Sequence, residues 1–247
     1  LRRTKSVRAV RQKASAMTKR NVRNDNTSRS PRTVIPRRGG TPRRGNLITQ
    51  KIKKGETLLK VALITGASGA IGRETALKFI NDGYFTVGQF NNGGDRIEAF
   101  VSALKNENKS DYFFPFRADL KNAKDCAALA EFTLENFGHT DVFVSVAGTD
   151  VYKLCTETTE KEWDDIFSVN TKSAFLLTKS LLPSMIERKK GSLLYVSSIW
   201  GVSGACMETA YSASKAALIG FCKAIAKEVA PSGITANCVC PGVIDTP

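Results

Sequence analysis

The sequence predicts an α/β protein built on a doubly wound parallel sheet. Two observations predict this fold class. Between residues 58 and 247, six short and nearly continuous apolar runs, typical of strands buried on both faces, alternate with stretches of helical periodicity. A glycine-rich turn connects the first run to the first helical stretch. Because parallel strands need right-handed crossovers, we expect helices on both faces of the sheet.

The chain begins with a strongly basic segment. Residues 1–60 hold 19 of the 37 Lys and Arg residues and two of the 23 acidic residues, a net charge of +17, so the rest of the chain carries −3 of the formal +14. This segment has few large apolar side chains and no periodic apolar stripe. We therefore expect residues 1–57 to form a disordered basic tail and residues 58–247 to form one folded domain.

Three interpretations of the basic tail are open. It is a solvated segment or one outside the natural mature protein, a nucleic-acid-binding arm, or a transit peptide. The first is favoured, and nucleic acid is not expected as a partner, because no aromatic residue is interleaved with the charges to stack on bases. No run approaches the roughly 18 apolar residues of a membrane span, and no signal-peptide core is present. We expect a cytoplasmic protein that does not enter a membrane.

The first strand is expected within LLKVALIT, residues 58–65. The turn GASGAIG follows directly, and then a helical stretch that ends at Gly83. In such a turn Gly66, Gly69 and Gly72 let the backbone approach a pyrophosphate, which the N–H groups and dipole of the helix N-terminus can bind. A merely structural tight turn is the alternative, and the strand-to-helix context favours a dinucleotide.

The remaining elements continue the alternation. Their expected ranges are a strand at 84–90, a helix at 95–106, a strand at 112–116, a helix at about 122–137, a strand at 141–148, a long helix at about 159–187 interrupted near residue 170, a strand at 193–196, a helix at 211–230 and a strand at 234–240. No helix–strand unit recurs as a sequence repeat. One doubly wound domain accounts for all of these elements.

Tyr211 and Lys215 are the candidate catalytic pair. They stand four residues apart at the start of the last long helix, so their side chains share one face. A lysine ammonium near a phenol favours the ionised form of the phenol and lowers its pKa. Ser198 supplies a hydroxyl at the end of the preceding strand, where open α/β sheets bind ligands. A single pair with this spacing is usually a half-buried surface pair, so other motifs must decide.

With these elements in order, residues 58–247 resemble the short-chain dehydrogenase/reductase family. The motifs that carry the resemblance are TGASGAIG, Asp119 after the third strand, VAG at 146–148, Asn170, Ser198, YSASK, and PGVIDT at 241–246. The long helical stretches look like the subgroup that includes 3-oxoacyl-[acyl-carrier-protein] reductases. SSIWG with GACMETAYSASK also resembles the bacterial reductases that act on the 5-aminopentanone modification of elongation factor P.

The resemblance implies a Rossmann fold and an NAD(P)H-dependent enzyme that reduces a ketone or 3-oxoacyl thioester to a hydroxyl. Tyr211 would protonate the carbonyl oxygen, and Lys215 would lower the pKa of Tyr211 and bind the nicotinamide ribose. Ser198 would donate a hydrogen bond to the same oxygen. Asn170 would hold a water between Lys215 and solvent, or else it is a helix-kink residue. The implied cofactor-binding residues are Gly66, Ser68, Gly69, Ile71, Gly72, Asn91, Asp119, Leu120, Ala147, Gly148, Tyr211, Lys215, Pro241, Gly242 and Val243.

In the family pattern Asp119 pairs with the adenine amino group. The alternative is that Asp119 caps the helix that follows it. NADP(H) is favoured over NAD(H), because no carboxylate stands at Gln89, Phe90, Asn91 or Asn92, where NADH users commonly carry one. The arginine that many NADPH users carry in the glycine turn is replaced by Gly69. Arg73 or Arg96 is the candidate cation for the 2′-phosphate.

The sequence departs from the family pattern at several positions. Ala70 replaces the central glycine of the turn, Ser145 and Val146 replace two asparagines whose amides support the sheet, and residues 204–209 form a lip of uncertain shape. The family continues past Pro247 with a lid, a strand and a helix. We therefore expect a C-terminally truncated domain with an exposed sheet edge and an open pocket, and a homodimer rather than a tetramer. A truncated, non-catalytic homologue that acts as a binding module is the alternative from another functional class.

Cysteine and histidine usage argues against metal and triad chemistry. The six cysteines contain no CxxC pair, which predicts buried free thiols and no metal site. His139 is the only histidine, and we expect it to be exposed in a turn before a strand. A Ser-His triad or a zinc hydrolase would need a histidine that this chain lacks at the expected site.

Overall fold

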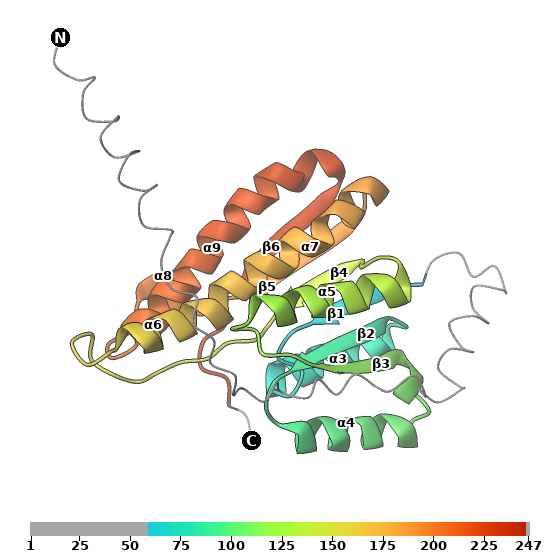
Figure 1. The fold of residues 1–247 in the computed structure, drawn as a ribbon, viewed down its shortest axis with the longest axis horizontal. Coiled ribbons are helices and arrows are strands. Elements are labelled where there is room, and N and C mark those ends of the chain that lie inside the picture. Colours follow the sequence, from blue (N-terminus) through green and yellow to red (C-terminus); the bar gives the residue numbers. More distant parts are fainter. Residues whose placement is uncertain (1–58, 246–247) are drawn as a thin grey trace, which may run out of the picture. The chain divides into compact units, whose positions relative to one another are not determined.

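A computed structural model describes residues 59–245. Its strands form one parallel sheet in the order β3-β2-β1-β4-β5-β6 (Figure 1). The strands are β1 (Val61–Ile64), β2 (Phe85–Phe90), β3 (Phe113–Arg117), β4 (Val142–Ser145), β5 (Gly191–Val196) and β6 (Ile234–Val239). The predicted fold class is confirmed. The predicted disorder of residues 1–57 lies outside the described residues.

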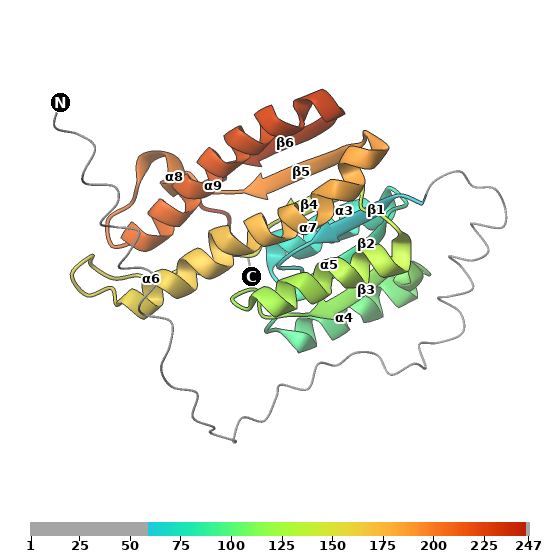
Figure 2. The same cartoon turned by 45° about the horizontal axis from the view of Figure 1, so that its top comes forward.

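The helices cover the sheet in two layers (Figures 1 and 2). One face packs against α3 (Ala70–Asn81) and α4 (Gly94–Asn106). The other face packs against α5 (Ala123–Phe137), α7 (Ser173–Arg188) and α9 (Thr209–Val229). The sheet order reverses between β1 and β4, so the crevice at the carboxyl ends of these two strands is the expected ligand site.

Shorter elements complete the described chain. They are η1 (Ser110–Tyr112), α6 (Glu160–Phe167), the π-helical η2 (Ser168–Lys172), α8 (Trp200–Ser203) and η3 (Ala230–Ser232). The predicted interruption near Asn170 is the η2 segment between α6 and α7, which confirms that expectation. Residues of α8 were not predicted as a helix. None of the helices in residues 59–245 is long and apolar enough to cross a membrane.

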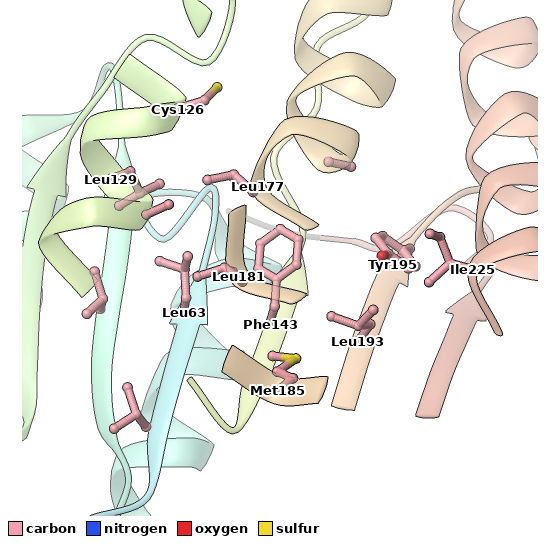
Figure 3. Close-up of a cluster of buried hydrophobic side chains, with 14 of the residues drawn as sticks. Leu63, Cys126, Leu129, Phe143, Leu177, Leu181, Met185, Leu193, Tyr195 and Ile225 are labelled. Atoms are coloured by element: carbon pink, nitrogen blue, oxygen red, sulfur yellow. The ribbon is translucent and has the colours of Figure 1, made fainter. Parts of the chain in front are cut away.

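The larger hydrophobic core lies between the sheet and α7 (Figure 3). Leu63, Phe143 and Leu193 extend from β1, β4 and β5 and are fully buried. Leu177 and Leu181, one turn apart on α7, are equally buried against them. Full burial of each such side chain contributes roughly 1.5–3 kcal/mol, so this layer holds the central strands and the helix in a fixed relation.

An ion cluster closes the end of the sheet opposite the ligand crevice. Asp141 accepts hydrogen bonds from the backbone N–H of Val61 at 2.9 Å and from Arg188 at 2.7 Å. Burial alone would raise the pKa of Asp141, but hydrogen bonds from His139, Arg188 and Val61 outweigh it and hold the pKa well below its usual range. The cluster joins β1, β4 and the end of α7.

His139 is not exposed, so that expectation was wrong. Its side chain is 13% exposed, its Nε2 lies 3.3 Å from Asp141 and its ring bonds to the carbonyl oxygen of Leu59 at 3.0 Å. The buried acid draws the imidazole inward. The thiols also differ from the expectation: Cys126 and Cys222 are buried, but Cys155 and Cys206 lie in surface loops and are exposed. Within residues 59–245 no group of side chains has the arrangement of a metal site.

Candidate active site

Two adjoining cavities lie at the carboxyl ends of the strands. The larger, of about 680 Å³, follows the glycine turn and the ends of β2 and β3. The smaller, of about 370 Å³, contains Ser198, Tyr211 and Lys215. The residues that line both cavities are Ile71, Val146, Gly148, Thr149 and Gly242. The two sets of residues that the sequence predicted for cofactor binding and for catalysis therefore meet in one crevice.

The glycine turn has the close backbone approach that a pyrophosphate site needs. Gly66 has a positive φ of 71°, and a Cβ there would lie 3.0 Å from the backbone of Ala147. A Cβ on Gly72 would lie 2.1 Å from the carbonyl oxygen of Gly66. Gly69 stands at the N-cap of α3 and donates its N–H to that same oxygen at 3.0 Å. Larger residues at Gly66 and Gly72 would break the turn.

Gln89 supports this turn from β2, a role that the sequence did not reveal. Its side-chain oxygen accepts the N–H of Gly66 at 3.0 Å, and its nitrogen donates to the carbonyl oxygen of Ala118 at 2.8 Å. The side chain is 2% exposed. Because both ends of the amide are engaged, Gln89 holds the turn in place against the end of β3.

The outer end of the larger cavity holds the residues expected to select the cofactor. Asn91 and Arg96 line it, and Arg117 at the end of β3 donates from Nε to the carbonyl oxygen of Asn91 at 3.1 Å. Arg73 instead pairs with its neighbour Glu74 at 3.3 Å and does not line the cavity. Arg117 was missed in the sequence, where only the pairing of β3 with β2 would have pointed to it.

Asp119 and Leu120 line the same cavity at the end of β3. The Asp119 carboxylate accepts the backbone N–H of Lys121 at 3.1 Å, which shapes the turn. The helix that follows is capped by Asn122, whose side chain accepts the N–H of Lys124 at 2.9 Å. Asp119 is therefore not the cap of α5, and that alternative was wrong.

The catalytic candidates come together at the start of α9. Tyr211 and Ser198 share a side-chain hydrogen bond. The Lys215 ammonium lies 5.6 Å from the centroid of the Tyr211 ring and donates to the carbonyl oxygen of Val196 at 2.8 Å. Ser197 fixes the helix to the strand end, because its hydroxyl donates to the carbonyl oxygen of Lys215 at 2.8 Å. Sequence spacing predicted the first three residues and missed Ser197.

The electrostatics of this pair differ from the expectation. Burial raises the pKa of Tyr211, the carboxylates of Asp150 and Glu208 raise it further, and the hydrogen bond with Ser198 opposes them. Burial lowers the pKa of Lys215 to about 8, since the residue is only 3% exposed. The expected lowering of the Tyr211 pKa by Lys215 is therefore not seen. The raised pKa favours the protonated form of the Tyr211 hydroxyl, which is the form that can donate a proton.

Asn170 positions the loop that follows β4. Its side-chain oxygen accepts the N–H of Thr149 at 2.8 Å, and its nitrogen donates to the carbonyl oxygen of Thr149 and to Ser214, both at 2.9 Å. A Cβ on Gly148 would lie 3.3 Å from the Lys215 ammonium and 3.4 Å from Asn170. The loop thus brings these groups together, and the role of Asn170 in holding a water stays a prediction.

The segment after β6 borders the smaller cavity. Pro241, Gly242 and Val243 all line it, and the carbonyl oxygen of Pro241 accepts the N–H of Ile199 at 2.8 Å. That bond ties the segment to the beginning of α8. Val243 is 91% exposed, so it lies at the open rim of the cavity.

Comparison with known proteins assigns the chain to a family. The profile described as short chain dehydrogenase matches residues 60–247. The chain belongs to this family. A 3-oxoacyl-[acyl-carrier-protein] reductase of Staphylococcus aureus (strain Mu50) is 34% identical over 187 residues, which are 76% of this chain and 75% of that protein. The corresponding reductase of Thermotoga maritima is 35% identical over 193 residues, with the same two coverages.

The solved structures agree with this assignment. A crystal structure of a short-chain dehydrogenase from Streptomyces avermitilis matches with a TM-score of 0.71 at 34% sequence identity. The match covers 76% of this chain and 67% of that one. The family relationship predicted from the sequence is thus confirmed by both sequence and fold.

Short-chain dehydrogenases use NAD(P), and the residues of the larger cavity fit such a cofactor. The glycine turn has no room for a side chain at Gly66 or Gly72 and leads into the N-terminus of α3, which suits a pyrophosphate. Polar groups of Asn91, Arg96 and Asp119 lie further along the same cavity. The cavity therefore has donors for phosphates near the turn and polar partners for a ribose and a base beyond it.

Two departures from the family pattern are compensated in the structure. Ala70 is the first residue of α3, so the missing central glycine falls inside the helix and not in the turn. At the end of β4, the hydroxyl of Thr65 accepts the N–H groups of Val146 and Ala147 at 3.0 and 3.1 Å. Thr65 thus supports the segment that lacks the family's two asparagines.

Proposed function

We propose that this short-chain dehydrogenase reduces a ketone or 3-oxoacyl thioester to the corresponding hydroxyl with NADPH. One observation carries the proposal: Ser198, Tyr211 and Lys215 converge in a cavity that adjoins the glycine turn. The named relatives from Staphylococcus aureus and Thermotoga maritima are 3-oxoacyl-[acyl-carrier-protein] reductases, which supports a 3-oxoacyl thioester as a substrate.

The bound cofactor supplies a hydride to the carbonyl carbon. Tyr211, whose raised pKa favours the protonated form of its hydroxyl, donates that proton to the carbonyl oxygen. Ser198, already hydrogen-bonded to Tyr211, donates to the same oxygen and stabilises its developing charge. Lys215 holds a positive charge beside the ring, which stabilises the phenolate left by proton transfer, and it binds the ribose hydroxyls. Asn170 keeps the loop at Gly148 in place.

NADPH is the proposed cofactor form. Arg96 and Arg117 flank the turn at Asn91, and no carboxylate occupies the end of β2 where it would repel a 2′-phosphate. Of the two arginines that the sequence offered as the cation for the 2′-phosphate, Arg96 is therefore favoured, because Arg73 pairs with Glu74.

A homodimer is the proposed assembly. Exposed apolar side chains gather between α7 and α9, where Phe175 and Ile186 are 45% and 44% exposed. With Leu182 and Phe221 they line a groove of about 330 Å³. A second copy of the same two helices would cover this surface. Residues 58–247 are proposed as the reductase domain, with no contribution from residues 1–57 to the site.

The function is tested by turnover. Purified full-length protein is incubated with NADPH and either acetoacetyl-N-acetylcysteamine or a series of simple ketones, and NADPH oxidation is followed by absorbance. We expect oxidation with at least one carbonyl compound, at a rate that depends on Tyr211. A folded protein that binds NADPH but oxidises it with none of these compounds would support the alternative of a non-catalytic binding module.

A further inference from the structure

Two carboxylates lie in the substrate cavity beside the catalytic tyrosine. Asp150, on the loop after β4, and Glu208, just before α9, line the same cavity as Tyr211. Both are close enough to raise the pKa of Tyr211 by their negative charge. Glu208 is partly buried, and burial together with Asp150 raises its own pKa. Reduction of a carbonyl does not itself require these charges.

The nearby cations are already engaged elsewhere. The backbone N–H of Lys153 donates to the carbonyl oxygen of Met207, but the Lys153 ammonium points to Glu162 and donates to it at 2.6 Å. This bond is the largest cause that lowers the pKa of Glu162 to about 2. The Lys215 ammonium donates to the carbonyl oxygen of Val196 at 2.8 Å. Among residues 59–245, neither Asp150 nor Glu208 takes part in an ion pair. Within the described residues, neither carboxylate is therefore neutralised by an ion pair.

The backbone directs Glu208 into the cavity. Glu208 occupies the N-cap position of α9, yet its side chain makes no capping hydrogen bond there. The preceding Met207 has a left-handed φ of 64°, unusual for a residue with a side chain. The carbonyl oxygen of Met207 accepts the N–H of Lys153 at 2.8 Å, which fixes this strained turn. The carboxylate is thus positioned for something other than the helix end.

An aromatic ring completes the lining. Trp200, at the start of α8, lines the cavity together with both carboxylates. The face of a tryptophan ring attracts cations, and two carboxylates do so more strongly. An uncharged substrate would instead remove water from the carboxylates without replacing those contacts, at a cost in free energy.

We infer that the substrate cavity selects carbonyl compounds that carry a positively charged amine, with Asp150 and Glu208 as its specificity residues. This inference rests on the proposed carbonyl reduction and narrows its substrate class. The ammonium group lies near the two carboxylates while the carbonyl oxygen meets Tyr211 and Ser198. The positive charge of the substrate offsets the two negative charges that act on Tyr211.

The test compares two ketones of the same shape. One is a methyl ketone with a trimethylammonium group three methylenes from its carbonyl, and the other is its uncharged tert-butyl isostere. A trimethylammonium group is used because a free primary amine at that distance would cyclise onto the ketone. We expect kcat/KM to be roughly 10- to 100-fold higher for the cation with the full-length protein and NADPH, and the preference to shrink as salt is added. Equal values, or a preference for the isostere, would overturn the inference.

Charge-neutralising variants identify the residues. Glu208→Gln and Asp150→Asn should each lower the preference roughly 3- to 10-fold, and the double variant should abolish it. Glu131→Gln, which removes an exposed carboxylate on α5, is the matched control and should leave the preference unchanged. A preference that survives in the double variant would contradict the assignment.

Binding separates this inference from the proposed function. If neither ketone is reduced, titration calorimetry with the same two compounds gives their affinities directly. A cation preference that depends on Glu208 and Asp150 would then support the charged site while contradicting carbonyl reduction. Equal affinities would overturn the charged site whatever the turnover result.

Discussion

The ammonium of Lys215 lies 5.6 Å from the centre of the Tyr211 ring, while it is bonded to the carbonyl oxygen of Val196 at 2.8 Å. The lysine is therefore held by the end of β5 and faces the ring without a direct bond to the phenol. Burial and the neighbouring carboxylates raise the pKa of Tyr211, which favours its protonated form. The lysine charge has its largest effect after proton transfer, when the phenolate has formed.

Tyr211→Phe should abolish reduction and leave cofactor affinity nearly intact. Only the hydroxyl that donates the proton is lost, which should lower kcat by at least roughly 100-fold. Steady-state kinetics and NADPH titration measure the two effects. Tyr152→Phe is the control, because that side chain is 67% exposed and does not line the cavity. Turnover within a few-fold of the wild type in Tyr211→Phe would rule out this residue as the acid.

The pH dependence of turnover and of stability should report the titration of Lys215. Burial lowers its pKa to about 8, so kcat/KM should be level below this pH and fall as the pH rises through it. Stability should change in the opposite direction. Between about 8 and the ordinary lysine value of 10.5 the unfolded chain binds more protons than the folded one, so the free energy of unfolding should rise.

Lys215→Met supplies the comparison for both pH effects. It should remove the stability increase between pH 8 and 10, measured by urea unfolding, and should weaken both turnover and NADPH binding. A lysine needed only to solvate the surface would change none of these quantities. An unaltered pH profile of unfolding in the variant would show that another group titrates there.

Asp141→Asn should destabilise the fold without touching the crevice. Loss of one partner leaves Arg188 short of its buried counter-charge, a cost of about 3 kcal/mol near neutral pH. Because the folded pKa of Asp141 lies below its ordinary value of 3.8, the wild type has this contribution above that pH and loses it as the pH falls. The difference in the free energy of unfolding between the variant and the wild type should therefore become smaller at low pH.

Thermal unfolding across this pH range is the measurement. Asp165→Asn is the matched control, because its carboxylate pairs with Lys121 and Lys161 at the surface. Exposed pairs contribute little to stability, so its melting temperature should stay close to that of the wild type. Equal effects of the two substitutions would mean that burial of the Asp141 cluster has no energetic consequence.

Local pattern was sufficient to predict the order of the sheet elements. Each buried strand is a continuous apolar run, and the glycine turn and the helix after it carry their own backbone signals. The positions of Ser198, Tyr211 and Lys215 followed from motif spacing. Interactions that join distant segments could not be read in the same way, as Gln89 and Thr65 show. Each supports a loop from another strand through a bond that has no sequence signature.

Charge effects were the least predictable part of the site. The sequence suggested that Lys215 lowers the pKa of Tyr211, because only their spacing of four residues was visible. The fold adds burial and the carboxylates of Asp150 and Glu208, which act in the opposite direction. His139 was misplaced for a similar reason, since its partner Asp141 is two residues away and the burial of that acid depends on β1 and α7.

Phe175→Glu should dissociate the proposed dimer. A carboxylate in the apolar groove between α7 and α9 would be buried without a partner if a second copy packed there. Light scattering should show the mass of a dimer for the wild type and of a monomer for the variant. Ser102→Glu on α4, on the other face of the sheet, is the control and should stay dimeric. A wild-type monomer at micromolar concentration would contradict the proposed assembly.

The cofactor preference should depend on Arg96 and on Arg117, which contacts the backbone of the cavity residue Asn91. Arg96 lines the cavity and Arg117 contacts the carbonyl oxygen of Asn91, so both lie where a 2′-phosphate would meet the end of β2. Bonds between guanidinium and phosphate are charge-assisted, and loss of one typically costs about 1.5–3 kcal/mol, or roughly 10- to 150-fold in affinity. Arg96→Ala and Arg117→Ala should each weaken NADPH binding within this range and change NADH binding little.

Arg73→Ala is the matched control, since Arg73 pairs with Glu74 away from the cavity. It should leave both dissociation constants unchanged. Asn91→Asp adds a carboxylate that repels the phosphate and can bond a ribose hydroxyl, so it should shift the preference toward NADH. Calorimetric titration of the wild type and these four variants with both cofactors decides the matter. Tighter binding of NADH than NADPH by the wild type would overturn the proposed preference, and loss of NADPH affinity only in Arg73→Ala would place the phosphate on the other side of the turn.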